Sequence, residues 1–594
     1  MNMKRALLGI AAMVVFFAAG NLHAQTLGMA GSGSSALWLE LGQASATAAG
    51  CVWTEAKGSS GSPMDLEVQD TRPSTAVLEQ GNLWVTWNPG TTGTCAAPAG
   101  GTITVNFLYN LDSVIGNRCF FANPACSIKV NANPTGVAGG NKVTGFTDTA
   151  LPASIEAVVA AASMNTAATD IRPEDAKFAS LRMFTPCGNP IVTGSQYIGL
   201  GYQTGTAGVG TSVAENPIAG SSSFHVLDFN LMGSDPITGN SLTGAYTVTE
   251  VGAQPIIVFV NPGDSGGFGS LLVQNVNRGD LAGFLDGSLG RTLDLVPGYS
   301  AANPASEVFV REPLSGTYNT MEYAIPNSAE MQTSQDLGLA ALNANLDSPG
   351  TTVPAVYCSA IGGTFTAANA NPLNETPSSL NLSSRAPASG ATAGRFRAIG
   401  TGDEVAAVLA NKDSLGYSFW SAANFANATG ANAKYLTVDG VDPLFEDWED
   451  GEIPATTAAL SNVTLQHVKD GSYPIWSILR LVTANSGAGF NAVTALEASV
   501  NKFVGPTQPD FVPISTLPIV RSHFSPPGAG TLFNYPCNTN LNGGAENTPS
   551  NGSKLTVETP GCGGDVGGVV YSLQADADYA SDSGNAVGLV GRRQ

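Results

Sequence analysis

Short apolar runs of strand character alternate with helical stretches along most of this chain, and this alternation constrains the fold more than any other feature. In order, the runs are TITVNFLYNL (102–111), SIEAVVAAASM (154–164), PIIVFV (255–260), DEVAAVLANK (403–412) and SILRLVTA (477–484). Strands separated by helices predict an α/β architecture with mainly parallel sheets. A chain of 594 residues is also too long for one hydrophobic core, so we expect at least two lobes.

The N-terminus has the features of an export signal. A short basic start is followed by an apolar run from Ala6 to Ala19, and Ala24 stands just before Gln25. This pattern is typical of a secretory signal peptide over residues 1–24. The first cysteine after the apolar run is Cys51, so we do not expect a lipid anchor. No later stretch has the ~18 apolar residues that a membrane span needs, and the sequence predicts a soluble periplasmic or secreted protein.

Charge and cysteine content limit the partners. Only 12% of the residues are charged and the net charge is −21, which excludes binding to nucleic acid or an anionic membrane through a broad basic field. The eight cysteines all follow the signal peptide, which favours disulfides in an oxidising compartment. Candidate pairs are Cys51 with Cys95, Cys119 with Cys126, and Cys537 with Cys562, although sequence alone does not fix the connectivity. No cysteine or histidine cluster has metal-ligand spacing, so we expect neither a metal site nor a cofactor.

The segment NPGDSGGFGS (261–270) contains GDSGG, a pattern found around the nucleophile of serine hydrolases. A serine nucleophile needs a histidine base. His225 lies in SSSFHVLDF, which does not match the trypsin-like context, whereas His467 and His523 follow Ser265 as other hydrolases require. Asn and Pro interrupt the preceding strand, and the glycines are poor helix formers. We interpret the segment as a glycine-rich loop and keep a secreted serine hydrolase using Ser265 as the alternative.

Three loops, far apart in the sequence, have the composition to hold one small anion. The first lies in AGSGSSALWLELGQA (30–44), where small residues precede an amphipathic run. Backbone N–H groups at a helix N-terminus, together with the hydroxyls of Ser34 and Ser35, favour an oxyanion. An ordinary N-cap of a surface helix is the alternative interpretation.

The second loop lies in VFVREPLSGTYNTMEYAI (308–325), where a strand delivers Arg311 and Ser315-Gly316-Thr317 starts a helix. Arginine offers a planar fork of donors that matches a tetrahedral oxyanion. Glycine lets the backbone approach a ligand closely. The alternative is a surface arginine next to a capping turn.

The third loop lies in NTAATDIRPEDAKFAS (165–180), where Asp170 ends a run of small residues. An ionised carboxylate only accepts hydrogen bonds, so beside an anion site it favours an anion that still carries a proton. The alternative is that Asp170 caps a helix that starts at Pro173.

These motifs resemble those of the periplasmic phosphate-binding proteins that supply ABC transporters. In chain order they are AGSGSSA, TDIRPED, PIIVFVNP, LAGFLDGSLG, REPLSGT, GTGDEVAAVLANKDSLGYSFW with YLTVDGVDP, and YPIWSILRLVT, from about residue 26 to about residue 485. The resemblance implies a two-lobed Venus-flytrap fold in which the chain crosses between the lobes twice. It also implies a non-enzymatic, monomeric solute-binding protein, with phosphate buried in the interlobe cleft and an ABC permease as partner.

By position, the resemblance implies one set of ligand contacts. They come from Ser35, the backbone of Ala36, Asp170, Arg311, Ser315, Gly316 and Thr317. A further serine of the family, from a Gly-Ser loop, has no clear counterpart, and Ser154 is the candidate for it. No catalytic residue is expected.

The implied domains are lobe 1 over 25–255 and 440–505, lobe 2 over 256–439, and a C-terminal extension with a disulfide over 506–594. Insertions at about 45–150, 184–250 and 325–393 depart from the family pattern. These departures leave open whether the protein docks on a standard permease. They also leave open a third class, a secreted surface protein that keeps the fold without a ligand.

Overall fold

The structure is a computed structural model. It describes residues 25–55, 64–67, 78–79, 82–88, 95, 102–121, 125–130, 151–171, 173, 184–187, 196–199, 246–263, 267–269, 273–286, 289–295, 305–311, 315–325, 394–398, 400–447, 450–517, 519–521, 557–558 and 570–572. The expected signal peptide, Ser265, and the candidate Cys537–Cys562 pair lie outside these residues. Among the helices of the described ranges, none combines the length and the apolar character that crossing a bilayer requires.

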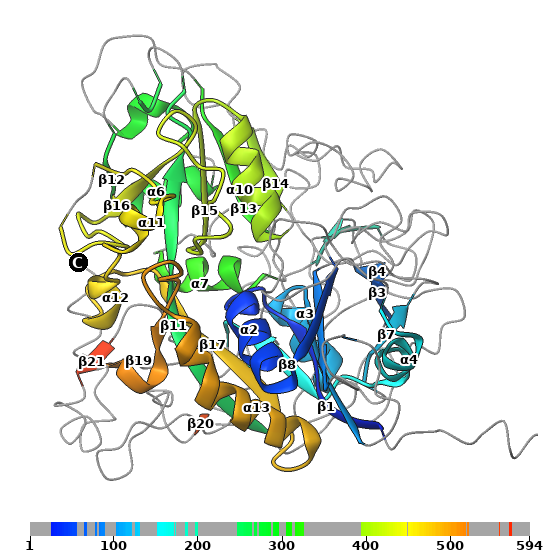
Figure 1. Cartoon of the computed structure of the whole chain (residues 1–594). Helices are drawn as coiled ribbons and strands as arrows, with labels where there is room; N and C mark the ends of the chain where they lie inside the picture. Colours follow the sequence, from blue (N-terminus) through cyan, green and yellow to red (C-terminus); the bar gives the residue numbers. More distant parts are fainter. Residues whose placement is uncertain are drawn as a thin grey trace, which may run out of the picture.

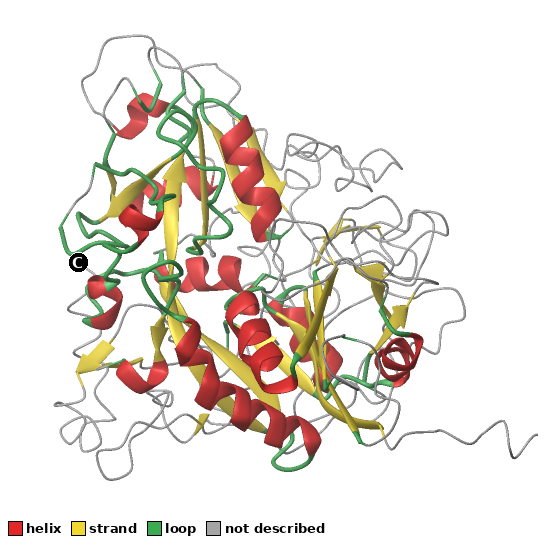
Figure 2. Ribbon diagram, in the orientation of Figure 1, coloured by secondary structure: helices red, strands yellow, loops and turns green. Residues whose placement is uncertain are grey.

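One mixed sheet of 14 strands organises the described chain, with helices on its faces (Figures 1 and 2). Its main path, from one edge to the other, is β14 (Gly394–Ala398), β13 (Glu307–Arg311), β15 (Ser414–Phe419), β11 (Thr247–Val260), β17 (Trp476–Thr483), β8 (Thr166–Thr169), β1 (Gln25–Gly33), β6 (Ile103–Asn110), β5 (Leu83–Trp87) and β2 (Cys51–Glu55). The α/β class is confirmed. Each of the five apolar runs forms the element that its pattern predicts, the two helices being α4 (Ala153–Ala161) and α10 (Thr401–Ala410).

The prediction of mainly parallel sheets is wrong at the centre of this sheet. Strands β1, β6 and β8 are parallel to one another, as are β13, β14 and β15. Strand β11, however, pairs antiparallel with β15, β16 (Lys434–Val438) and β17, and β17 pairs antiparallel with β8. Strands β6, β5 and β2, at the far end of the path, are also paired antiparallel. The helical crossovers that make strands parallel therefore account for only part of the sheet.

Strand β11 connects a lower group of strands (β17, β8, β1, β6, β5, β2) to an upper group (β13 to β16), as Figure 1 shows. Its first half pairs with β17 and its second half with β15 and β16. In the second half, Ile256, Val258 and Val260 enter one core and Ile257 and Phe259 enter the core on the opposite face. Burial on both faces explains why the run PIIVFV is apolar throughout rather than alternating.

Helices cover both faces of the lower group. On one face, α2 (Trp38–Ala49) and α13 (Ala488–Val500) lie side by side (Figure 2) and share a core with Met29 of β1. On the other face, α3 (Ser113–Phe121) and α4 share a core with Ala30 of the same strand. The adjacent residues Met29 and Ala30 therefore point to opposite cores. Strand β1 is thus covered by helices on both faces, and the loop that follows it begins between these two helical layers.

Two of the candidate disulfides are confirmed. Cys51, at the start of β2, is bonded to Cys95, and Cys119 of α3 is bonded to Cys126, just before β7 (Ser127–Val130). Both bonds lie in the lower group. They fit a protein of an oxidising compartment.

Residues 505–517, which overlap the start of the expected C-terminal extension, pack where the two strand groups meet. Strand β18 (Val512–Pro513) pairs with β11 at Gly252 and Ala253. The indole Nε1 of Trp420 donates to the carbonyl of Pro509 (3.1 Å). This part of the extension therefore belongs to the main core.

Within this segment, Asp510 forms a buried carboxyl pair with Glu40 of α2. Asp510 accepts hydrogen bonds from Ser421 Oγ (3.1 Å) and the N–H of Ala422 (2.9 Å). Glu40 accepts one from Gln508 Nε2 (2.8 Å). Burial, and next the neighbouring Asp510 carboxyl, raise the pKa of Glu40 well above its usual range, and burial raises the pKa of Asp510. The folded state therefore binds protons at this pair more tightly than the unfolded chain does.

This pair predicts a pH dependence of stability. Because the folded-state pKa values are raised, the stabilisation is complete below the ordinary carboxyl range and is lost as the pH rises through the raised values. Glu40→Gln supplies a donor that does not titrate, so we expect the variant to be more stable than the wild type at pH 8 by about 1–3 kcal/mol. Denaturant unfolding at pH 5 and pH 8 measures this difference. The matched control is Glu452→Gln at an exposed position, and an equal pH slope in wild type and Glu40→Gln would contradict the prediction.

Candidate functional site

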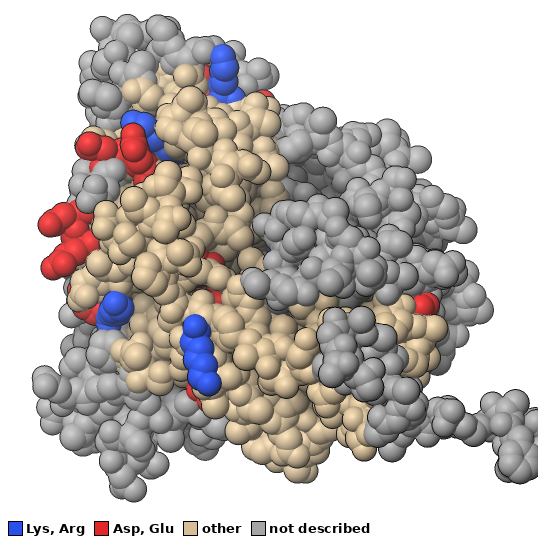
Figure 3. Space-filling view, in the orientation of Figure 1, with Lys and Arg blue, Asp and Glu red and all other residues tan. Residues whose placement is uncertain are grey.

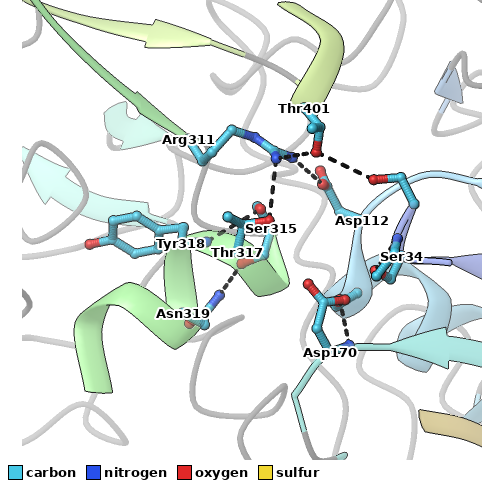
Figure 4. A network of polar contacts seen from close by, with 12 residues as sticks. Ser34, Asp112, Asp170, Arg311, Ser315, Thr317, Tyr318, Asn319 and Thr401 are labelled. Carbon is cyan, nitrogen blue, oxygen red and sulfur yellow. Dashed lines mark hydrogen bonds and ion pairs between the residues drawn. The ribbon is translucent and has the colours of Figure 1, made fainter. Parts of the chain in front are cut away.

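Arg311, the last residue of β13, lies where the upper and lower strand groups meet. Its guanidinium contacts Asp112 Oδ1 through Nη2 (3.2 Å), and Thr401 Oγ1 (2.9 Å) and Thr317 Oγ1 (3.4 Å) through Nη1 (Figure 4). Asp112 follows β6 of the lower group, whereas the two threonines belong to the upper group. The side chains of Arg311 and Asp112 are only 3% and 4% exposed, so this cation is a buried group that joins both halves of the sheet and not a surface residue.

The first predicted loop reaches the Arg311 network through Thr401. Ser35, between β1 and α2, has its hydroxyl 3.3 Å from Thr401 Oγ1. The hydroxyl of the neighbouring Ser34 accepts a hydrogen bond from the N–H of Ala36 (3.0 Å). The small residues of this loop let it approach the upper group closely enough for a hydroxyl contact.

Asp170, from the third loop, follows β8 and is 2% exposed. Its Oδ1 accepts a hydrogen bond from the hydroxyl of Ser113 (2.6 Å). The backbone N–H of Asp170 donates to the Oγ of Ser113 (3.2 Å). Gly316, at the start of α7 (Gly316–Ala324), lies so near that any β-carbon there would overlap both Ser113 Oγ and the Asp170 carboxyl group. Only glycine allows this approach, so the three predicted loops come together.

The charge state of Asp170 reflects opposing effects. Burial raises the pKa of this carboxyl group. Hydrogen bonds from Ser113 and Ser34, and the positive charges of Arg311 and Arg480, act in the opposite direction, and the net shift is upward from the ordinary value. The ionised form of Asp170 thus depends on its donors and on two nearby arginines.

Among the described residues, four helices begin at the site: α2 after the Ser35 loop, α3 at Ser113, α7 at Gly316 and α10 at Thr401. Ser315 caps α7, since its Oγ accepts from the N–H of Tyr318 (3.4 Å). The first N–H groups of a helix have no partner within the helix, and they carry partial positive charge. Helix starts, hydroxyls and one guanidinium form a set of donors that suits a small oxyanion, and Asp170 adds an acceptor for a proton.

The structure brings most of the predicted ligand residues together. Ser35, Ala36, Asp170, Arg311, Ser315, Gly316 and Thr317 all lie in or directly beside this network. Ser154 does not, because α4 packs beside β7 at the side of the lower group away from α7 (Figure 1). Nothing in the local sequence distinguishes this helix start from the ones at the site.

Sequence reasoning missed Asp112, Ser113 and Thr401. Asp112 and Ser113 stand between the end of a strand and the start of a helix, which is the same strand–turn–helix pattern that singled out Arg311 and Ser315. That pattern is the signal by which they could have been found. Thr401 follows Gly400, whose φ of 81° marks a left-handed turn before α10.

The structure gives a reason for Gly263 and Gly267, the first and last residues of GDSGG, that involves no catalysis. A β-carbon at Gly267 would overlap the carboxylate of Asp413, and the N–H of Phe268 donates to Asp413 Oδ1 (3.3 Å). A β-carbon at Gly263 would overlap the same carboxylate, so the described residues at both ends of the motif pack closely against Asp413. Of the histidines that follow the motif, His467 has ring nitrogens 2.9 Å from Ser472 Oγ and 3.1 Å from the carbonyl oxygen of Glu446.

The surface agrees with the low content of basic residues. On the face drawn in Figure 3, the Lys and Arg side chains of the described chain lie apart from one another, and Asp and Glu side chains gather along one edge. Because the whole chain has a net charge of −21, a field that attracts an anion must come from local groups.

No protein-family model matches the chain, and no curated protein matches it. Among solved structures, the chain is similar to an ABC-type phosphate transport receptor from Vibrio cholerae (12% identity, 44% of this chain and 70% of that chain covered, TM-score 0.22). It is also similar to a phosphate-binding protein from Stenotrophomonas maltophilia (15% identity, 46% of this chain and 69% of that chain covered, TM-score 0.24). A third similar structure is PstS from Borrelia burgdorferi (14% identity, 42% of this chain and 64% of that chain covered, TM-score 0.20). The chain thus spans less than two thirds of the Borrelia protein. The likeness is one of fold, and at these TM-scores it carries no argument about a ligand.

Proposed function

We propose that this chain is an exported, non-enzymatic solute-binding protein that captures inorganic phosphate, or a similar protonated oxyanion, for uptake by an ABC transporter. The observation that carries the proposal is the buried Arg311 guanidinium, surrounded by hydroxyls at helix starts and lying near the Asp170 carboxyl group. A fixed fork of donors matches an oxyanion, and the carboxylate matches a proton on it. The binding protein acts as a monomer that delivers its ligand to a permease.

We further propose that the two strand groups are two lobes and that the anion lies in the cleft between them. This is supported by the origins of the site residues, since Arg311 and Thr401 come from the upper group and Ser35, Asp112 and Asp170 from the lower one. The chain would cross once along β11. Residues such as Leu444 and Val468 pack in one core with Trp420 of the upper group, so we place the return crossing close to β17 and not at residue 440.

The proposal is tested on the purified mature chain, residues 25–594. We expect phosphate to be released when the protein is denatured, and calorimetry on the stripped protein to show saturable phosphate binding. Absence of both would contradict the proposal and favour a surface protein without a ligand. A fluorophosphonate probe tests the hydrolase alternative, and labelling at Ser265 would establish it.

Ser113→Ala is expected to weaken phosphate binding by about 1–3 kcal/mol, or about 5-fold to 150-fold, because it removes a hydroxyl that also satisfies Asp170. Ser154→Ala is the matched control, a serine at another helix start that lies away from the site. Calorimetry on both variants measures the difference. Equal losses, or a larger loss in Ser154→Ala, would show that the site has been placed wrongly.

A further inference from the structure

Two side chains of β17 hold the backbone of Asp170 from behind the site. Ser477 Oγ donates to the carbonyl oxygen of Asp170. Arg480 Nη1 donates to the same oxygen (3.0 Å) and to the carbonyl of Ile478 (2.8 Å). Together with the N–H of Asp170, which is bonded to Ser113, these contacts fix the peptide groups on both sides of the Asp170 α-carbon.

Arg480 is a buried cation that faces an acidic residue on the neighbouring strand. It is 0% exposed, in the middle of β17. In the antiparallel register its neighbour on β11 is Glu250, which is also 0% exposed. Opposite charges at facing positions of a sheet attract one another. The register therefore pairs the charge of Arg480 with that of Glu250, while the Arg480 guanidinium donates to the Asp170 carbonyl.

We propose that Arg480 is a positioning residue that fixes Asp170 in the anion site and keeps its carboxyl group in the acceptor form. The proposal rests on the proposed function and adds to it the origin of the preference for a protonated anion. It predicts that a residue with no place in the ligand contacts sets how well phosphate is told apart from sulfate.

Two features of the structure support this role. The contacts of Ser477 and Arg480 converge on one carbonyl oxygen, which suits the positioning of a single residue more than the general packing of a strand. The Arg480 charge also lowers the pKa of Asp170 against the larger effect of burial. Loss of this charge therefore raises the pKa further, and the protonated, donating form of Asp170 then extends to higher pH.

The test uses the full mature chain and compares Arg480→Met with wild type by competition calorimetry with phosphate and sulfate from pH 5 to pH 8. In Arg480→Met we expect the phosphate-to-sulfate preference to fall at least tenfold at pH 7, and sulfate binding to appear at a higher pH than in wild type. Arg480→Lys keeps the charge and a donor, so it should recover much of the preference. Val482→Ala, a buried apolar truncation on the same strand, is the control for loss of packing and should leave the preference unchanged.

Arg480→Met leaves Glu250 buried without its cation, which can prevent folding. The double variant Arg480→Met/Glu250→Gln removes both charges, and Ser477→Ala removes one donor to Asp170 without touching a charge. Both variants should lower the phosphate-to-sulfate preference. In the double variant, sulfate binding should also appear at a higher pH than in wild type, whereas in Ser477→Ala the pH dependence should stay that of the wild type. An unchanged preference and pH profile in these variants, beside a wild type that binds phosphate, overturns the inference and leaves the proposed function standing. A wild type that binds no phosphate overturns both.

Discussion

Replacing Arg311 with alanine is expected to remove anion binding almost completely. Truncating one partner of a buried, hydrogen-bonded charge pair costs about 2–5 kcal/mol, which is on the order of a hundredfold or more in affinity. The loss should be at the upper end of this range, because Arg311 also compensates the buried carboxylate of Asp112. Without the guanidinium, an incoming anion would meet the carboxyl groups of Asp112 and Asp170 and would lose the cation that lies between the two strand groups.

Calorimetric titration of phosphate into wild type and Arg311→Ala measures the effect. The matched control is Arg278→Ala, which removes an arginine whose ion pair with Asp439 lies nearer the surface (side chains 12% and 33% exposed). That variant should bind phosphate like the wild type. Arg311→Lys keeps the charge but loses the planar fork, so it should fall between the two. Near-normal affinity in Arg311→Ala would place the anion elsewhere in the molecule.

Local patterns predicted the elements of this fold well, and the pairing of strands less well. The run PIIVFV is apolar at every position because β11 is buried on both faces, and that is visible in the sequence. What the run does not reveal is its direction relative to its neighbours. Strand β11 is antiparallel to β15 and β17, since it connects the two groups of strands and does not belong to the helical crossovers within either one.

The candidate site follows from the same topology. Strands β1, β6 and β8 are parallel neighbours, so the residues after each of them, Ser35, Asp112 and Asp170, come to one edge of the sheet, where ligands of such sheets bind. Once β6 is known to be the neighbour of β1, the Asp112-Ser113 turn belongs to the site. Ser154 has a similar local sequence, but its helix packs beside β7. Strand order, which a single sequence does not supply, separates the two.

The contacts of Arg480 with Asp170 could not be predicted for a related reason. A lone arginine in the run SILRLVT gives no sign of its partner when its neighbours in the sequence are apolar. Its role depends on the register of β17 with β8 and β11, which places it opposite Thr169 and Glu250. Register is a long-range property, and a shift of one residue would turn the guanidinium to the other face of the sheet.

Asp170→Asn is expected to remove most of the preference for phosphate over sulfate. Inorganic phosphate has three acidic protons, so even after its second ionisation, which for phosphate esters lies at about 6, it still carries one proton near neutral pH, whereas sulfate has none to donate. An ionised Asp170 can accept a hydrogen bond from that proton. Sulfate offers no such donor, so its oxygens and the carboxylate of Asp170 would repel one another. A site built to hydrogen-bond a group that the competitor lacks can discriminate by about 10⁴ to 10⁵, and the Asn amide, which can donate to either anion, should lose most of this factor.

The pKa shift gives the same prediction a second readout. Burial raises the pKa of Asp170, so as the pH falls through that value the carboxyl group gains a proton and becomes able to donate. Rejection of sulfate by the wild type should therefore weaken toward acidic pH, while Asp170→Asn should accept sulfate at every pH. The matched control is Asp442→Asn, another buried aspartate with a raised pKa, which lies away from Arg311 and should keep the preference. If Asp170 served only as a helix cap, Asn would replace it well, and competition calorimetry would find the selectivity of Asp170→Asn equal to that of the wild type.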